Sequence, residues 1–261
     1  MRFSIVTTVL NGMPYVEDTV RSVLGQSYAN LEYLVVDAGS TDGTVERLHD
    51  LLERDERAML ISRPGMGMYD AIFFGFDRAK GDMLAWLNAD DLYPTWALDR
   101  VAKHLAERPN HRWVSGLPSA WDAEGALTDV RPQGWHPQRL IRDGWFHRDL
   151  LGFIQQECIF FSKTLYDQLT PQDRRAVLSK NLAGDYALWR RFALYEKLET
   201  IPSVIGGFRR HGDNRSVVHM DEYMGEVRSD GATFLPGPLT PLARHLYWLY
   251  AANGARRAVA R

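Results

Sequence analysis

Two apolar runs flank an amphipathic segment in residues 3–37, FSIVTTVLNGMPYVEDTVRSVLGQSYANLEYLVVD. The runs at residues 3–10 and 32–37 are short and rich in β-branched side chains, which is typical of buried strands. Residues 15–24 between them repeat apolar side chains at helical spacing; these are Val16, Val20, Val23 and Leu24. A strand, a helix and a second strand in this order predict a crossover that returns the chain to the same end of a parallel sheet.

The alternation of strand and helix patterns continues to residue 88. The later segments are a helix with Val45, Leu48, Leu51 and Leu52 on one face, a strand at 58–62, a helix at 68–79 and a strand at 83–88. We therefore predict an α/β fold with a mostly parallel central sheet flanked by helices. Beyond about residue 110 the pattern becomes irregular, and we interpret that part as an elaboration of the same domain. Its candidate elements are strands at 157–161 and 202–208, a helix at 185–195 and a terminal helix from 239.

The composition excludes several classes of protein. The chain has 261 residues, 45% of them hydrophobic, and 31 basic against 33 acidic side chains give a formal net charge of −2. This balance gives no general electrostatic reason to bind nucleic acid. The single cysteine, Cys158, excludes a disulfide framework and a cysteine zinc site. No run approaches the roughly 18 apolar residues that span a bilayer, and the start of the chain lacks a secretory signal pattern, so we expect a cytoplasmic protein.

Polar residues follow three of the predicted parallel strands where each strand ends. Thr8 closes the first strand, Asp37 closes the second, and the run NADD at residues 88–91 follows the fourth. Ligands of open parallel sheets bind beyond the carboxyl ends of the strands. We therefore expect these side chains to share one rim of the sheet.

The adjacent carboxylates of Asp90 and Asp91 are the strongest chemical signal in the chain. Two acids after a buried strand are costly unless a cation binds there. Mg²⁺ and Mn²⁺ prefer oxygen ligands, and proteins commonly hold them with one or two carboxylates together with substrate phosphates. The alternative is that the two acids cap the helix that begins near Thr95.

Asp37 also has two interpretations. A carboxylate at a strand end can accept hydrogen bonds from ribose hydroxyls or a nucleobase, or it can cap the turn that contains Ser40 and Thr41. No GxGxxG follows the first strand and no Walker lysine is present, so neither a Rossmann dehydrogenase nor a P-loop enzyme is indicated. This absence favours a phosphate group that is held by a metal.

Five motifs occur in the order and at the intervals of a known family. They are TVLNG at 8–12, VVDAGSTDGT at 35–44, GMYDA at 67–71, LNADD at 87–91 and GDYALWRR at 184–191. Over roughly residues 3–215 the chain resembles the inverting, family 2-like nucleotide-sugar glycosyltransferases with the GT-A fold. The resemblance implies that a sugar moves from a UDP, dTDP or GDP donor to a hydroxyl of a saccharide or lipid-linked acceptor. It also implies a hexosyltransferase that uses Mn²⁺ or Mg²⁺ and serves surface polysaccharide or glycoconjugate synthesis.

The resemblance assigns the donor side of the site to the predicted rim. The donor-binding residues that it implies are Thr8, Asp37, Asp70, Asn88 and Asp90. Asp37 would face the pyrimidine or the ribose, and Asp70 would lie near the donor ribose. Asp90 matches the last acid of the family's DXD motif and would bind the metal or the diphosphate, with Asp91 beside it. The first DXD position holds the neutral Asn88, which leaves metal binding to Asp90 and Asp91.

The same resemblance places the acceptor side on later motifs. Asp185 matches the acid that acts as general base on the acceptor hydroxyl, and the alternative is that it caps its helix. Trp189, one helical turn on, would face the same way and stack on the acceptor sugar. Gln156 and Glu157 fall where the family lines the acceptor side. The residue before the base is commonly Glu in the family, whereas this chain has Gly184.

Two further features have open interpretations. His211 lies in RRHGDNRS, residues 209–216. This segment resembles the family's mobile loop, in which a histidine or an arginine reaches the diphosphate or the metal. The alternative is a solvated basic loop. A group of rings could form an acceptor platform or pack against the body. It consists of Trp135, His136, Trp145, Phe146 and His147.

We predict a glycosyltransferase domain over residues 1–220 and a C-terminal helical extension over 221–261. The extension carries Leu246, Tyr247, Leu249 and Tyr250, followed by Arg256, Arg257 and Arg261. Aromatic and cationic residues together favour contact with an anionic membrane surface, which would place the protein at the inner face of a membrane. The alternative is a terminal helix that packs on the domain.

The residues leave two other functions open. Asn88 and Gly184 suit a non-catalytic nucleotide-sugar or glycan-binding module built on the same fold. Paired carboxylates also serve glycoside hydrolases, which need two acids at a glycosidic bond and no nucleotide. Binding of a nucleotide diphosphate separates the hydrolase from the other two functions, and turnover separates the enzyme from the binding module.

Overall fold

The computed structural model of the protein describes residues 1–132 and 134–259, with side chains described up to residue 251. The strands are β1 (Phe3–Val9), β2 (Leu31–Asp37), β3 (Ala58–Ser62), β4 (Met83–Trp86), β5 (Trp113–Ser115), β6 (Ser119–Trp121), β7 (Leu127–Val130), β8 (Ile159–Ser162), β9 (Glu199–Thr200) and β10 (Phe208–Arg209). The helices are α1 (Val16–Leu24), α2 (Thr44–Leu52), α3 (Met68–Arg78), α4 (Ala97–Glu107), α5 (Gln138–Arg142), the 3-10 turn η1 (Gln156–Cys158), α6 (Lys163–Tyr166), α7 (Pro171–Leu178), α8 (Gly184–Tyr195), α9 (Arg215–Val218), α10 (Met220–Ser229) and α11 (Leu239–Val259).

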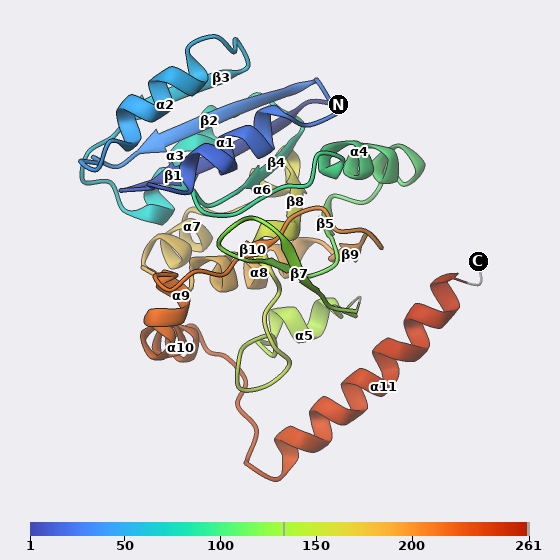
Figure 1. Cartoon of the computed structure of the whole chain (residues 1–261). Coiled ribbons are helices and arrows are strands. Elements are labelled where there is room, and N and C mark those ends of the chain that lie inside the picture. The colour runs from blue at the N-terminus through green and yellow to red at the C-terminus, as the bar shows by residue number, and fades with distance from the viewer. Residues whose placement is uncertain (133, 260–261) are drawn as a thin grey trace.

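The central sheet is mostly parallel, as predicted. It has seven strands in the order β3-β2-β1-β4-β8-β5-β9. β1 is parallel to β2 and β4, and β2 is parallel to β3, whereas β8 is antiparallel to both of its neighbours. Along β1, Ile5 packs into the apolar layer with α1, α2 and α4, and Val6 packs into the opposite layer with α3 and α8. The sheet therefore lies between two helical layers (Figure 1).

Most predicted elements are confirmed to within two residues. The strand predicted at 202–208 is wrong, because that segment holds only the first residue of β10 and an isolated bridge from Gly207 to Leu92. A Cβ at Gly206 would lie 1.9 Å from the backbone oxygen of Glu157, and one at Gly207 would lie 1.8 Å from Nε1 of Trp121. The two glycines let the chain pass directly against its neighbours instead of forming a regular strand.

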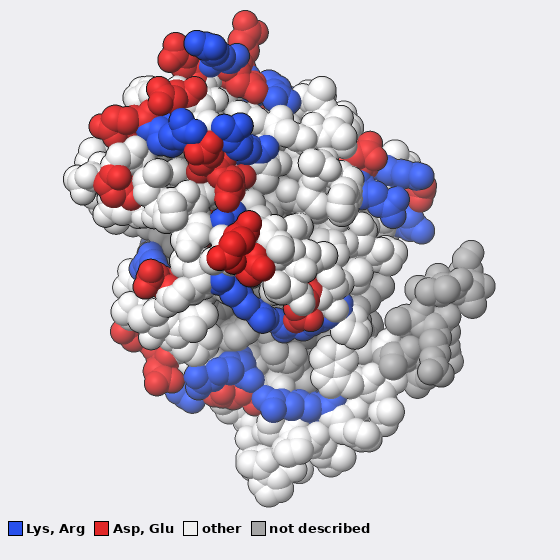
Figure 2. Space-filling model, in the orientation of Figure 1, with Lys and Arg blue, Asp and Glu red and all other residues white. Residues whose placement is uncertain are grey.

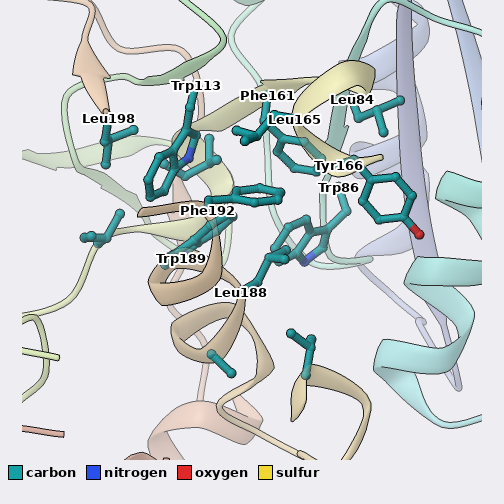
Figure 3. Close-up of a cluster of buried hydrophobic side chains, with 14 of the residues drawn as sticks. Leu84, Trp86, Trp113, Phe161, Leu165, Tyr166, Leu188, Trp189, Phe192 and Leu198 are labelled. Carbon is teal, nitrogen blue, oxygen red and sulfur yellow. The ribbon is translucent and has the colours of Figure 1, made fainter. Parts of the chain in front are cut away.

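Large aromatic side chains fill the core between the sheet and α8. Figure 3 shows Trp86, Trp113, Phe161, Trp189 and Phe192 gathered there. Trp189 stacks on Trp86 with the ring centroids 5.3 Å apart, and it is 3% exposed. The prediction that Trp189 stacks on the acceptor is therefore wrong, because core side chains already cover its ring. Burying a large apolar side chain of this kind contributes about 1.5–3 kcal/mol.

The aromatic group at residues 135–147 packs the C-terminal helix against the body. His147 is fully buried and Phe146 is 4% exposed. Tyr247 of α11 lies edge-on to Phe146 with a centroid distance of 5.9 Å, and its hydroxyl donates a hydrogen bond to the carbonyl of Trp135 at 2.6 Å. These contacts support the packing interpretation of the group over an acceptor platform.

The described part of α11 presents apolar side chains to solvent. The exposed ones are Leu239, Leu242, Leu246, Trp248, Leu249 and Tyr250, and Figure 2 shows a largely uncharged surface there. Arg256, Arg257 and Arg261 lie outside the residues whose side chains are described. No helix among the described residues is long and apolar enough to cross a membrane. Contact with a membrane surface and a cytoplasmic location stay predictions.

The predicted domain boundary at residue 220 coincides with the start of α10. Tyr223, Met224 and Val227 of α10 are buried against Ala183 and Tyr186 at the start of α8. α10 therefore packs with the body that carries α8, and the chain reaches α11 only after residues 230–238. The division into two parts stays a prediction.

Candidate active site

Three strand ends bring the predicted donor residues to one edge of the sheet. Asp37 ends β2 opposite Val9 of β1, and Thr8 is the preceding residue of β1. β4, which leads into residues 88–91, pairs with the other side of β1 in parallel. This register confirms the prediction of a shared rim.

Asp37 supports the turn after β2. It is 2% exposed, and its carboxylate accepts hydrogen bonds from the backbone N–H groups of Gly39 at 2.9 Å and Ser40 at 3.2 Å. This is the turn-capping interpretation, and contact of Asp37 with a nucleoside stays a prediction. Asp70 is exposed in the first turn of α3, and Thr8 is half-buried. Their donor contacts stay predictions as well.

The structure explains why the neutral residue Asn88, and not an acid, stands at the first DXD position. Its Nδ2 donates to Oδ2 of Asp91 at 3.0 Å and to Oε1 of Gln156 at 3.3 Å. Oδ1 of Asp91 accepts the backbone N–H of Arg209 at 2.8 Å. Asp91 is fully buried, and this burial, together with the charges of Glu157 and Asp90, raises the pKa of Asp91 well above its usual range. Asn88 thus supplies a donor where another acid would face Asp91.

Asn88→Asp restores the first acid of the DXD motif, yet we expect it to destabilise the protein. The new carboxylate would lose both donated hydrogen bonds and place an extra charge beside the buried Asp91, which costs about 2 kcal/mol or more. We expect a thermal melt several degrees lower and no tighter binding of Mn²⁺ by calorimetry. Asn88→Ala, which removes the donor without adding charge, is the control. Its melting temperature should lie between those of wild type and Asn88→Asp. Tighter Mn²⁺ binding at an unchanged melting temperature would contradict this account.

Asp90 and His211 meet on the open side of the rim. Nε2 of His211 lies 2.8 Å from Oδ2 of Asp90, whose side chain is 31% exposed. The His211 ring stacks on Tyr15 with centroids 4.5 Å apart, and its backbone N–H donates to Oδ1 of Asn214 at 2.8 Å. The side chain of His211, which is 9% exposed, therefore packs against the rim and is not solvated as the alternative interpretation required.

The predicted metal ligands are not assembled as a set of three. Among the side chains of residues 1–132 and 134–251, no three or more His, Cys, Asp or Glu form a group that could hold a metal ion. The oxygens of Asp91 accept hydrogen bonds from Asn88 and from the backbone of Arg209. This buried carboxylate therefore holds those two segments together below the rim. Asp90 alone keeps an accessible carboxylate beside His211. One carboxylate with substrate phosphates still fits the usual way in which proteins bind Mg²⁺.

Asp185 is held at the start of α8. It is the second residue of that helix, so it is not the N-cap, which is Ala183. The Tyr223 hydroxyl donates to Oδ1 of Asp185 at 3.1 Å. Burial raises the pKa of Asp185 to about 6. A carboxyl group with this pKa is ionised at neutral pH and can accept a proton from an alcohol in a reaction.

The structure also explains why residue 184 is a glycine. A Cβ at this position would lie 2.6 Å from three carbon atoms of the Tyr69 ring. The Tyr69 hydroxyl donates to the carbonyl of Leu182 at 2.7 Å and accepts the N–H of Asp185 at 3.3 Å. Tyr69 of α3 therefore occupies the space of a side chain at 184 and fixes the backbone next to the predicted base.

Glu157 links the donor and acceptor sides. It is 5% exposed on η1, and burial raises its pKa to about 7, with smaller contributions from the charges of Asp185 and Asp90. Its neighbour Gln156 accepts the hydrogen bond from Asn88 and donates to the carbonyl of Trp86 at 2.6 Å. The hydrogen bond between Asn88 and Gln156 thus ties η1 to the run at 88–91, and the charges of Asp185 and Asp90 both raise the pKa of Glu157.

The sequence model of Glycosyl transferase family 2 matches residues 4–167, which is more than half of the chain. The chain belongs to this family. A PGL/p-HBAD biosynthesis glycosyltransferase of Mycobacterium bovis is 30% identical over 178 residues, which are 66% of this chain and 64% of the relative. The chain spans only 15% to 40% of the length of several other relatives.

Two solved structures share the fold of this family 2 member. The mannosyltransferase PcManGT of Pyrobaculum calidifontis, in complex with GDP-Man and Mn²⁺, covers 97% of this chain and 70% of its own, with a TM-score of 0.62 and 19% identity. S. aureus TarS 1–349, in complex with UDP-GlcNAc, covers 95% and 72%, with a TM-score of 0.61 and 12% identity. At these identities the likeness shows the GT-A fold alone.

The family match ends before Asp185 and His211. Two aromatic residues that the sequence did not single out lie beside them, Tyr15 against His211 and Tyr223 against Asp185. Tyr15 follows the TVLNG motif by three residues, and its place in the loop after β1 could have drawn attention to it. Tyr223 is 38 residues from Asp185, and no motif connects the two.

Proposed function

We propose that this family 2 protein transfers a sugar from a nucleotide diphosphate to a hydroxyl of a saccharide or lipid-linked acceptor, with inversion. The observation that carries the proposal is the contact between α3 and α8, where the hydroxyl of Tyr69, the neighbour of Asp70, accepts the N–H of Asp185 at 3.3 Å. The charges of Asp90 and Asp185 both raise the pKa of Glu157, which supports the same arrangement. An acid at the donor rim and a separate acid on α8 therefore share one site. This is the arrangement that a direct displacement requires.

The proposed reaction is a single displacement. The acceptor oxygen forms a bond to the anomeric carbon as the bond from that carbon to the diphosphate oxygen breaks, and the acceptor proton moves to Asp185. Because the acceptor attacks opposite the leaving group, the anomeric centre inverts. Asp90 is the residue that would hold a divalent ion, which would neutralise the charge that develops on the diphosphate.

The relatives support the class of donor and the setting that we propose. PcManGT was solved with GDP-Man and Mn²⁺, and TarS with UDP-GlcNAc, so nucleotide-diphosphate sugars suit this fold. The M. bovis relative is a biosynthesis glycosyltransferase by name, which is in keeping with surface polysaccharide or glycoconjugate synthesis. The binding-module alternative rested on Asn88 and Gly184. Each of these has a local packing cause, so neither now argues for a loss of activity.

Binding of nucleotides tests the proposed function. We expect one of UDP, GDP and dTDP to raise the melting temperature, and Mn²⁺ or Mg²⁺ to enlarge the shift. A ligand at 100 times its Kd stabilises a protein by about 2.7 kcal/mol, which is readily seen in a thermal-shift assay. CMP, which lacks the second phosphate, is the control and should give a smaller shift. If no nucleoside diphosphate shifts the melting temperature, the proposal is wrong. If one of them does, but the sugar of the corresponding nucleotide-sugar donor is neither transferred nor slowly hydrolysed, the protein is a binding module.

A further inference from the structure

Asp185 receives a hydrogen bond from a tyrosine on a different helix. The Tyr223 hydroxyl donates to Oδ1 at 3.1 Å. Within the described part of the chain, no other side chain donates a hydrogen bond to this carboxylate. Tyr223 is 6% exposed and packs edge-on against Phe153, with centroids 5.4 Å apart. The hydroxyl is therefore held in one place by the packing of its ring.

α10 is fixed to the start of α8 by a second contact. Glu226, three residues after Tyr223, accepts the backbone N–H groups of the residues that precede α8. These are Asn181 at 2.9 Å, Leu182 at 3.0 Å and Ala183 at 2.8 Å. One turn of α10 thus holds both the backbone before Asp185 and the Asp185 carboxylate itself. The distance between the Tyr223 hydroxyl oxygen and Oδ1 of Asp185 is therefore set by the packing of α10 against α8, and not by a flexible loop.

The titratable groups around Asp185 come from three elements besides its own helix. Burial raises the pKa of Asp185, and the negative charge of Glu226 on α10 raises it further. The Tyr223 hydroxyl and the backbone N–H groups of α8 lower it. On η1, Glu157 interacts with the Asp185 charge, and on α3 the Tyr69 hydroxyl accepts the Asp185 N–H. Tyr223 is therefore the side-chain donor that favours the ionised form.

We propose that Tyr223 is a positioning residue for the general base, and that its hydroxyl holds Oδ1 of Asp185 so that Oδ2 is the oxygen that takes the acceptor proton. This inference rests on the proposed function, in which Asp185 accepts that proton. Both oxygens of a free carboxylate can accept a proton. A fixed donor on one of them directs the proton to the other and stabilises the charged form that acts as a base.

Tyr223→Phe tests this role because it keeps the ring and removes only the hydroxyl. We expect the acid limb of the profile of kcat/KM against pH to move up by about one pKa unit, since a hydrogen bond to a charged group contributes at least that much. The activity at pH 6 should therefore fall about fivefold more than the activity at pH 8. Tyr186→Phe is the matched control, because the Tyr186 hydroxyl belongs to the same buried cluster but donates to the carbonyl of Gly144 at 3.2 Å. Its acid limb should stay at the wild-type pH.

A second variant keeps the test valid if Tyr223→Phe disturbs the packing of the core. Tyr223→3-fluorotyrosine keeps the ring and the hydroxyl and replaces one ring hydrogen by fluorine. The phenol becomes a stronger hydrogen-bond donor, so the acid limb of this variant should move to lower pH. Opposite shifts in the two Tyr223 variants support the positioning role. An acid limb that stays at the wild-type pH in the fluorinated variant overturns it, even if Tyr223→Phe loses activity evenly at every pH or fails to fold.

Failure of this inference is distinguishable from failure of the proposed function. If Asp185→Asn keeps wild-type transfer, Asp185 is not the base and the proposed function loses its chemistry. If Asp185→Asn is inactive while neither Tyr223 variant moves the acid limb, only the role of Tyr223 is overturned.

Discussion

Asp185→Asn lowers the rate of sugar transfer by about 10²–10⁴-fold at pH 7.5, the range typical of a lost general base. The amide fits the same space but cannot take up the acceptor proton. Steady-state release of nucleoside diphosphate in the presence of acceptor measures this loss. Binding of the donor should be unchanged, because Asp185 lies on α8 and not on the donor rim.

The pH dependence and stability of Asp185→Asn separate catalysis from folding. Burial raises the folded-state pKa of Asp185 to about 6, so wild-type activity should fall as the pH drops through 6, and the variant should lack this limb. The raised pKa also means that the folded protein binds this proton more tightly than the unfolded chain does. The ionised group therefore disfavours folding above pH 6, and the neutral amide should melt no lower than wild type at pH 7.5. Asp50→Asn, at an exposed acid on α2, is the control and should keep full activity. Wild-type turnover in Asp185→Asn would show that the base is another group.

Asp90→Ala is expected to weaken donor binding by at least about tenfold and to reduce the effect of Mn²⁺ in the same step. Asp90 has the one partly exposed carboxylate of the run at 88–91, beside His211. Removing a residue that hydrogen-bonds to a metal ligand typically lowers metal affinity about 10–100-fold, and removing the ligand itself should lower it at least as much. The KM for the donor, measured across a series of Mn²⁺ concentrations, checks this. We expect the variant to show a higher KM and little response to Mn²⁺, whereas an unchanged KM with a full response to Mn²⁺ would place the metal elsewhere.

The chain order of strands and helices could be predicted because local patterns carry it. β1 to β4 are short runs rich in apolar and β-branched residues, and α1 to α3 have one apolar face, so local patterns find them without knowledge of the fold. The strand at 202–208 failed because Gly206 and Gly207 are set by contacts with η1 and β6, which no local pattern reveals. A close approach between distant segments is a property of the tertiary structure.

The site shows the same limit. The shared rim followed from topology, since parallel strands end at the same edge. Trp189 was misplaced because spacing by four residues shows that two side chains share a helix face but not whether that face meets the core. Asp90 and Asp91 could not be told apart in the sequence, because adjacent acids look alike, and only the donors from Asn88 and Arg209 distinguish the buried acid from the accessible one. Metal binding by Asp91 stays a prediction. Tyr223 could not be found, because its partner lies on another helix.

The central claim is that two acids at one site have separate roles, Asp90 toward the diphosphate and Asp185 toward the acceptor. Calorimetric titration of the preferred nucleoside diphosphate with Mn²⁺ into wild type, Asp90→Ala and Asp185→Asn tests it most directly. We predict the same Kd, within about twofold, for wild type and Asp185→Asn, and a Kd at least about tenfold weaker for Asp90→Ala. Equal loss of binding in both variants, or wild-type binding in Asp90→Ala, would contradict the division of roles.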